Sequence, residues 1–245
     1  MSPSYAERAR AVVVTATALE VGVLSMTVPV ERHLADADGS LLLCAPPTGS
    51  GEPGSPLALA GRFPGPVLTA SLTDVAGVPQ PDRVRGRVRL TGALTLAAGP
   101  LAPEVTDHLG AGPGRPVLRL VPQRVAIDWR VGPEQEGWQG VDAAAYAAAA
   151  PDPLAGWEAG WTAHLDRDHP GLAAALARSV RPDLDPAAVV RPVLVDRGGI
   201  TLRVHHAPPS RTEDLHLPLG REVRCGCDAR LALQELVEAR LGPPR

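Results

Sequence analysis

The first half of the chain is a series of short apolar runs separated by turn-forming residues, and this series constrains the fold more than any other feature. The runs are VGVLSMTVPV (21–30), GSLLLCAP (39–46), PVLTASLTDV (66–75), RVRGRVRLTGALTLA (83–97) and PVLRLVPQRVAIDWRV (116–131). Segments rich in Val, Leu and Thr and bounded by Gly, Pro and Asp are typical of β-strands. The first two runs predict an antiparallel hairpin around ADADG, and about six strands in total predict a small barrel.

Composition narrows the classes of function. Only 3% of the 245 residues are aromatic, with Phe63 the single phenylalanine, so the core must be built from aliphatic side chains. The 24 basic residues are all arginine, which excludes a Schiff-base lysine and the lysine of a phosphate-binding loop. A net charge of −3 does not suit a protein that neutralises many phosphates, so we expect no nucleic-acid binding.

The composition of the chain changes near Pro151, where we expect a domain boundary. Residues 5–140 contain the strand runs and begin with a predicted helix over 5–19, which a Ser-x-x-Glu capping box starting at Ser4 would initiate. An Ala-rich helix over 141–150 is expected to connect this unit to the next.

Residues 151–242 predict a smaller domain. The segment 151–180 suggests helix, break, helix, and a hairpin around Arg-Gly-Gly follows over 192–206. A strand over 214–219 and an amphipathic helix over 227–242 complete the unit. The chain is therefore predicted to be α+β: a six-stranded antiparallel barrel with flanking helices, then helices packed on a three-stranded antiparallel sheet.

The sequence contains three cysteines, Cys44, Cys225 and Cys227. An odd number with one Cys-x-Cys pair does not make a disulfide framework, and a second half-site with zinc spacing is missing. The N-terminus lacks the features of a signal peptide, and no apolar run reaches the roughly 18 residues that span a membrane. We therefore expect reduced thiols and a cytoplasmic protein without membrane contact.

The stretch WTAHLDRDHPG places His164, His169 and two aspartates within six residues. Because Pro170 would clash inside a helix, one helix is expected to end near residues 165–166, with Asp168 or His169 capping the next. Asp168 would then have a structural role. His164, on the last turn of the first helix, could instead present its imidazole to a cofactor. A zinc site is disfavoured, because the proline break opposes the convergence of the two histidines.

Arginine alternates with apolar residues over RVRGRVRL (83–90). A period of two places Arg83, Arg85, Arg87 and Arg89 on one face of a strand. This arginine stripe is either a solvated outer face or the lining of an anion-binding groove, to which the guanidinium fork is suited.

Two parts of the sequence resemble known families. The stretch His-Leu-Asp-x-Asp-His-Pro, the Ala/Leu-rich helix after it and the strands DRGGITLRV and DLHLPL resemble the C-terminal domain of the haem-utilisation family of split-barrel proteins. That family usually has His-Met/Leu-Asn-x-Asp-His, and here Asp166 takes the place of the asparagine. LSMTVP, GSLLLCAP, TASLTDV and RVRLTGALT, in this order, are similar to the flavin-binding split barrel of pyridoxamine-phosphate-oxidase relatives. Together the resemblances cover residues 8–241.

The resemblance implies a split barrel that forms a homodimer and holds its cofactor at the subunit interface.

Two departures from the family pattern matter. TASLTDV offers hydroxyls such as Ser71 but no basic residue for a flavin phosphate, which Arg62, Arg85 and Arg87 would have to supply. No histidine follows His216, so the tail histidine that ligates iron in haem-degrading relatives is missing.

Three hypotheses follow. The first is a haem-binding protein of haem utilisation or degradation, with His164 as the iron ligand. The second is a non-catalytic regulatory protein that has lost the cofactor and binds a partner enzyme. The third is an FMN-dependent oxidoreductase. The candidate cofactor-binding residues are His164, His169, Arg62, Ser71, Arg85 and Arg87. The alternative iron ligands are His33, His108, His169, His205, His206 and His216.

Overall fold

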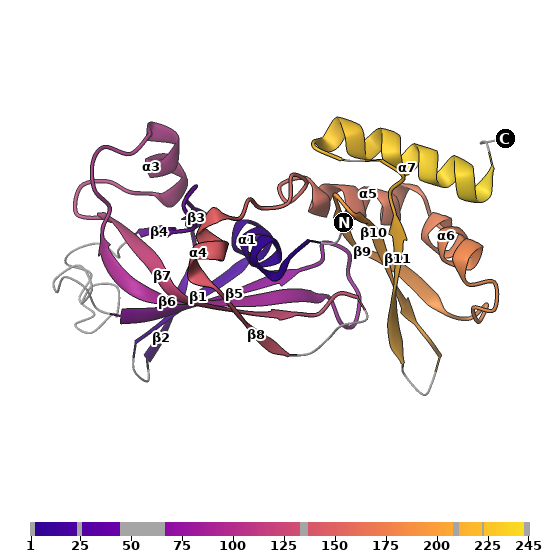
Figure 1. The fold of residues 1–245 in the computed structure, drawn as a ribbon, viewed down its shortest axis with the longest axis horizontal. Coiled ribbons are helices and arrows are strands. Elements are labelled where there is room, and N and C mark those ends of the chain that lie inside the picture. The colour runs from indigo at the N-terminus through magenta and orange to yellow at the C-terminus, as the bar shows by residue number, and fades with distance from the viewer. Residues whose placement is uncertain are drawn as a thin grey trace.

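The protein is α+β, with two separate antiparallel sheets that are each covered by helices (Figure 1). The computed structural model describes residues 3–23, 26–44, 67–132, 137–207, 211–221 and 223–242. The two sheets lie at opposite ends of an elongated molecule, and the N-terminus lies between them (Figure 1). In the part of the chain described, no helix is long and apolar enough to cross a membrane.

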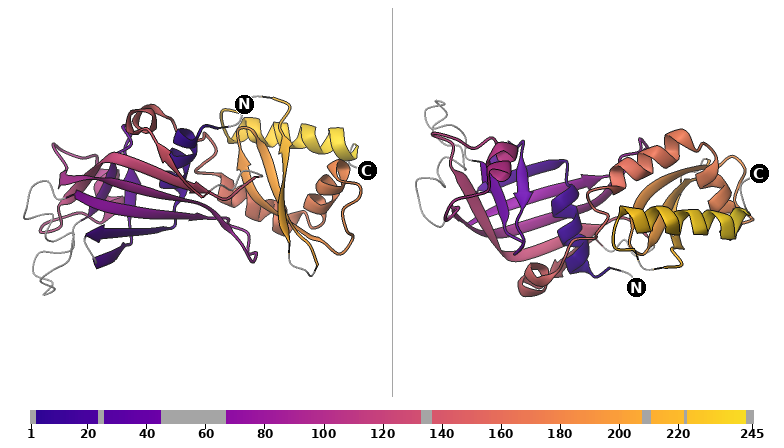
Figure 2. Two further views of the ribbon diagram at one scale, coloured as in Figure 1. Left: turned by 60° about the horizontal axis from the view of Figure 1, so that its bottom comes forward. Right: turned by 90° about the horizontal axis from the view of Figure 1, so that it is seen from above.

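The larger sheet is strongly curled (Figure 2). Its strands follow the order β2-β1-β5-β6-β7-β4-β3, and β8 also pairs with β7. The long strand β7 pairs with β6 along one edge and with both β4 and β8 along the other, and the curled sheet forms a half-barrel (Figure 2). The strands are β1 (Ala18–Val23), β2 (Met26–Val30), β3 (His33–Ala35), β4 (Leu41–Cys44), β5 (Val67–Val75), β6 (Val84–Leu96), β7 (Val117–Trp129) and β8 (Trp138–Val141). The helices around it are α1 (Tyr5–Thr15), α3 (Pro103–Leu109) and α4 (Ala143–Ala148).

Helix α1 packs on the inner face of the curled sheet (Figure 1). Ser4 caps it through the predicted capping box, in which Glu7 bonds back to the Ser4 backbone. Val12 and Val13 have branched side chains that lower helix propensity, but both are buried in a core cluster with strand residues such as Leu90. Tertiary packing therefore outweighs local propensity in this helix.

The strand pairing differs from the prediction in two ways. The described residues place eight strands in the larger sheet rather than six. The 21–30 run and the residues before it form two paired strands, β1 and β2, and the short strands β3 and β8 are additional. The 39–46 run pairs with β3 and β7 instead of forming a hairpin with the 21–30 run. The cause is a tight turn directly before it, in which Asp36 N–H donates to Ser40 O at 2.8 Å and Gly39 adopts a φ of 84°.

The smaller sheet has the order β11-β10-β9 and is antiparallel, as the sequence predicted. Helices α5, α6 and α7 pack around it (Figure 1) and share one core cluster with its strands, which includes Leu202, Leu217 and Leu236. The elements are α5 (Glu158–Asp168), α6 (Leu172–Val180), β9 (Val189–Asp196), β10 (Gly199–His205), β11 (Thr212–Pro218) and α7 (Gly226–Leu241).

Arg203 joins the smaller sheet to the larger one. Its side chain is fully buried and pairs with Asp214, with Nε 2.7 Å from Oδ1. Its two Nη atoms donate to the backbone oxygens of Asp82 at 2.6 Å and Arg130 at 2.7 Å. Asp214 also accepts the N–H of Gly132 at 2.8 Å. One ion pair in β10 and β11 thus satisfies backbone groups at the edge of the other unit.

Candidate functional site

The histidine-rich stretch lies where α5 ends. The helix continues to Asp168, further than predicted, and Pro170 then separates it from α6. Gly171 precedes α6 in the left-handed conformation, with φ of 86°, and α6 has no side-chain cap. Asp168 therefore does not cap the next helix, which corrects the expectation from the sequence. Its carboxylate instead contacts His164, one turn earlier in α5.

His164, Asp168 and His169 form one exposed group, called here the histidine cluster. His164 Nδ1 lies 2.6 Å from Asp168 Oδ2, one helical turn away. The Nε2 atoms of His164 and His169 are 3.3 Å apart, and the two rings meet edge to face with centroids 4.9 Å apart. The two imidazoles thus converge in spite of the break at Pro170, contrary to the expectation from the sequence.

Arg167 holds the Asp168 carboxylate in place. Its Nε and Nη2 donate to Oδ1 at 2.8 Å and to Oδ2 at 2.9 Å. The hydrogen bonds from Arg167 and from His164 keep the pKa of Asp168 well below its ordinary value. An ionised carboxylate only accepts hydrogen bonds, so Nδ1 of His164 carries a proton. In the neutral imidazole the lone pair is then on Nε2, which is the ligand form for a metal. In the structure this lone pair faces Nε2 of His169, 3.3 Å away.

The histidine cluster is open rather than a closed metal cage. The His164 side chain is 54% exposed. Among the residues that the structure describes, no group of three or more His, Cys, Asp or Glu side chains is placed to hold a metal ion. The described residues therefore offer a metal at His164 no three-residue site of this kind.

Strand β6 carries a β-bulge that removes Arg85 from the predicted arginine stripe. Val84 pairs with Val75 and Gly86 with Asp74, so Arg85 has no partner on β5. A bulge of this kind breaks the alternation and re-aims a side chain. Arg85 is only 2% exposed, which corrects the prediction of four guanidiniums on one outer face.

Arg87 and Arg89 stay on the outer face of the sheet, beside hydroxyl groups of β5. Arg89 lies directly opposite Ser71, and Arg87 lies opposite Thr73. The guanidinium of Arg89 also stacks 4.1 Å from the ring centroid of the half-exposed Trp138. The TASLTDV stretch has no basic residue of its own, but the register of the sheet gives it two.

Arg85 instead completes a buried ionic network between the two units. Its Nη2 donates to Asp74 Oδ1 at 2.7 Å, and its Nη1 donates to Glu158 Oε1. All three side chains are at most 5% exposed. Burial raises the pKa of Glu158 to about 7, against the lowering effect of Arg85. No local sequence signal marks Glu158, because Arg85 lies 73 residues away.

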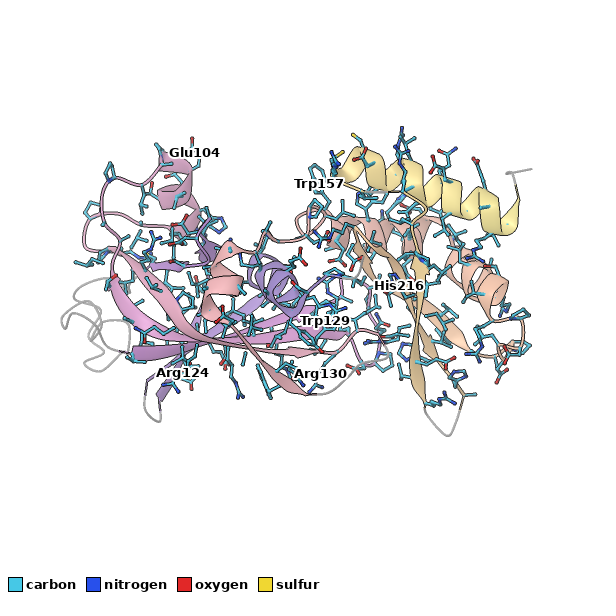
Figure 3. The ribbon with its side chains drawn as sticks, viewed as in Figure 1. Glu104, Arg124, Trp129, Arg130, Trp157 and His216 are labelled. Carbon is cyan, nitrogen blue, oxygen red and sulfur yellow. The ribbon has the colours of Figure 1, made fainter. Side chains whose placement is uncertain are left out.

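A pocket beside this network is too small for a large cofactor. Its lining includes Glu7 and Arg8 of α1, Trp129, Glu158 and Arg197 (Figure 3 labels Trp129 between the units). The pocket volume is about 30 Å³, which holds one or two water molecules. This pocket therefore has no room for a tetrapyrrole or a flavin.

The remaining predicted residues are placed as follows. Arg62 lies outside the described residues. The five other histidines each have a partner within the protein. His33 Nε2 lies 3.1 Å from Val13 O, His108 Nε2 3.1 Å from His33 O, His205 Nε2 3.1 Å from Gln80 Oε1, His206 Nε2 3.2 Å from Glu213 Oε1, and His216 Nδ1 3.2 Å from Thr201 Oγ1. Burial lowers the pKa of His33 and of His205. The histidine cluster lies beside the smaller sheet, whereas Arg87 and Arg89 lie on the larger sheet. The structure thus separates the two groups of residues on which the sequence prediction depends.

Comparison with known proteins gives a fold but no family. No family model matches the sequence, and no match to curated proteins was found. A solved haem-binding protein from Mycobacterium smegmatis has a similar fold, with a TM-score of 0.60, 23% identity and coverage of 98% of both chains. A protein of unknown function from Agrobacterium tumefaciens (TM-score 0.41, 15% identity, 97% of both chains) and an FAD- and haem-binding protein from Mycobacterium smegmatis (TM-score 0.34, 16% identity, 61% of this chain and 80% of that one) are more distant. The similarity to the first of these three proteins covers 98% of the chain and shows the overall fold, including both sheets.

Proposed function

We propose that this protein binds haem and that His164 would hold the iron. The observation that carries the proposal is the 2.6 Å bond between His164 Nδ1 and Asp168. A carboxylate on one imidazole nitrogen fixes the tautomer and orients the other nitrogen toward a metal. The Mycobacterium smegmatis protein of similar fold is described as haem-binding, which supports the same ligand class.

His169 would assist His164 rather than share the iron. Nε2 of His169 lies 3.3 Å from Nε2 of His164, so His169 contacts the nitrogen that would hold the iron. We propose that His169 lies beside the bound ring and stabilises the position of His164. Loss of His169 should then weaken haem binding less than loss of His164.

A haem held at the histidine cluster would be open to solvent, because the His164 side chain is 54% exposed. The pocket lined by Glu7 and Glu158 cannot enclose it, because its volume is only about 30 Å³. We infer that a second copy of the chain supplies the surface that covers the haem, in a split-barrel homodimer. Ser71, Arg87 and Arg89 on the outer face, and Arg62, are the candidates for contact with the propionates. Guanidinium groups bind carboxylates with two parallel hydrogen bonds, which suits this role.

Bound haem would supply redox and oxygen chemistry, and the residues of the chain would hold and orient it. Haem utilisation or degradation is the process in which we propose that this binding takes part. The cytoplasm is the compartment we propose for it.

Two other functions have specific support. A non-catalytic regulatory protein that binds a partner enzyme is favoured by the loss of Arg85 to the buried network, since this removes one expected cofactor contact. An FMN-dependent oxidoreductase is favoured by the pairing of Ser71 with Arg89, which creates a phosphate-binding combination of groups. The colour of the purified protein separates these two: yellow supports the flavin.

The test is a haemin titration followed by absorbance. We expect a Soret band in the wild type, a large loss of affinity in His164→Ala, and a smaller loss in His169→Ala. His216→Ala is the matched control, because His216 is an exposed histidine on β11 (Figure 3). The absence of a band, or one that no histidine variant changes, rejects the proposal.

A further inference from the structure

Two exposed thiols lie at the start of α7, on either side of Gly226. Cys225 and Cys227 are both free and exposed. Cys225 is the N-cap residue with an extended backbone (φ −155°, ψ 171°), and its Sγ accepts the N–H of Asp228 at 3.5 Å. A pair of surface thiols one residue apart can exchange with a disulfide of another molecule without any opening of the core.

An exposed tryptophan lies against this pair. Trp157 is 65% exposed, and its ring is the nearest group to Gly226 outside α7, 4.0 Å from where a Cβ would stand. Figure 3 shows it next to the N-terminal end of α7. Residues so far apart in sequence thus form one surface that contains a dithiol and a large apolar ring. The ring gives the site a platform for a partner molecule and an internal fluorescent reporter.

The reduced form is the one that keeps the helix intact. Cys225 stands just outside the helix, and its Sγ accepts the N–H of Asp228 as the cap of α7, so a bond to Cys227 takes this sulfur away from the cap. Closing the bond must therefore open the first turn of α7, including the bonds of Asp228 to Cys225 Sγ and to Arg224 N–H (3.1 Å). If forming a disulfide breaks hydrogen bonds of the native helix, that disulfide is easily reduced and therefore acts as an oxidant.

We propose that Cys225 and Cys227 form a redox-active dithiol that reacts reversibly with low-molecular-weight disulfides. One thiolate attacks a sulfur of the substrate disulfide, so that a mixed disulfide forms and the first substrate thiolate leaves and takes up a proton. The second thiolate then attacks the mixed disulfide and expels the second substrate thiol. The protein dithiol is oxidised by two electrons, and the substrate disulfide is reduced to two thiols. Gly226 supplies the backbone freedom that the closed form requires. This activity does not depend on haem.

The experiment uses the full chain with glutathione disulfide as the probe, followed by alkylation and intact mass. The wild type should lose two hydrogen atoms and retain no glutathione, and reduced glutathione should restore both thiols. Cys225→Ser and Cys227→Ser should each stop as a mixed disulfide with one glutathione. Cys44→Ser is the control and should behave as the wild type, because Cys44 is half-buried on β4.

Two further variants test the structural argument. Gly226→Ala should slow ring closure several-fold, because alanine stabilises the helical turn that has to open. Trp157→Phe should abolish the change in tryptophan emission that accompanies closure. A wild type that carries two glutathiones, or that does not react, overturns the proposal. So does closure at the same rate in Gly226→Ala with no change in Trp157 emission.

Discussion

The two ends of α5 carry the same kinds of ionic group in opposite surroundings. At its start, Glu158 is buried with Arg85, and burial raises the pKa of Glu158 to about 7. At its end, Asp168 is exposed with His164, and hydrogen bonds lower the pKa of Asp168. The first group is enclosed by protein and joins the two units. The second is open to solvent and can meet a ligand.

The comparison separates a structural role from a binding role. Removing one member of a buried ionic network leaves its partners charged and unpaired in a low-dielectric interior. Exposed ion pairs contribute little to stability, because water solvates the same groups in the unfolded chain. The start of α5 should therefore dominate stability, and the end of α5 should dominate ligand binding.

The largest effect is expected for Arg85→Ala, which leaves Asp74 and Glu158 buried without their cation. We expect the free energy of unfolding to fall by about 3–5 kcal/mol in denaturant titrations. Arg87→Ala is the matched control on the same strand, because its side chain is 42% exposed and its partner Asp128 keeps the closer pair with Arg130 at 2.9 Å. It should change the value by about 0.5 kcal/mol or less. Similar losses in both variants would show that the network has no special role.

The second effect is a pH dependence at Glu158. The pKa of Glu158 is raised by burial from 4.5 to about 7, so the folded state prefers the protonated acid. Its contribution to stability is complete below about pH 4.5 and is lost as the pH rises through about 7. The loss is about 3 kcal/mol at most.

Glu158→Gln isolates this contribution, because other groups titrate as well. Burial also raises the pKa of Asp152, which adds a slope of the same sign, while the lowered pKa values of His33 and His205 act in the opposite direction. The measurement is therefore the difference in unfolding free energy between wild type and variant at pH 5 and pH 7. A difference that does not change with pH contradicts the account.

The third effect concerns the ligand. Asp168→Asn keeps the shape of the carboxylate but weakens its hold on His164, so we expect haem affinity to fall roughly 10–100-fold. Asp183→Asn is the control, since Asp183 is an exposed aspartate held by Arg181 in the same way. Haemin titrations of both variants provide the check. Equal haem affinities in Asp168→Asn and Asp183→Asn would show that Asp168 does not contribute to haem binding.

The smallest effect is expected for the stability of His164→Ala. The side chain is 54% exposed, so the free energy of unfolding should change by about 0.5 kcal/mol or less. A loss as large as that of Arg85→Ala would mean that the histidine cluster is part of the architecture.

Periodic and capping patterns predicted the local elements well. The Ser4 capping box, the helix–break–helix of the smaller unit and its three-strand meander follow from nearest-neighbour chemistry, and the structure confirms them. The hairpin between the first two apolar runs was wrong, because the turn at Gly39 pairs the second run with β3. Apolar runs predict strands but do not specify which strand lies next to which.

The candidate site was less predictable, because its decisive contacts are long-range. The bulge at Arg85 depends on how β5 and β6 pair, and alternation along one strand contains no sign of it. Glu158 had no local signal for the same reason. The spacing of four residues between His164 and Asp168 suits a shared helix face, but the prediction ended the helix near residues 165–166, whereas α5 continues to Asp168.

The most direct test of the haem proposal is chemical rescue of His164→Gly. The complex of the wild type with haemin should show the spectrum of a histidine-ligated iron, the variant should lose it, and added free imidazole should restore it. Spectra that are identical in wild type and His164→Gly, with no response to imidazole, would contradict the assignment of His164 as the iron ligand.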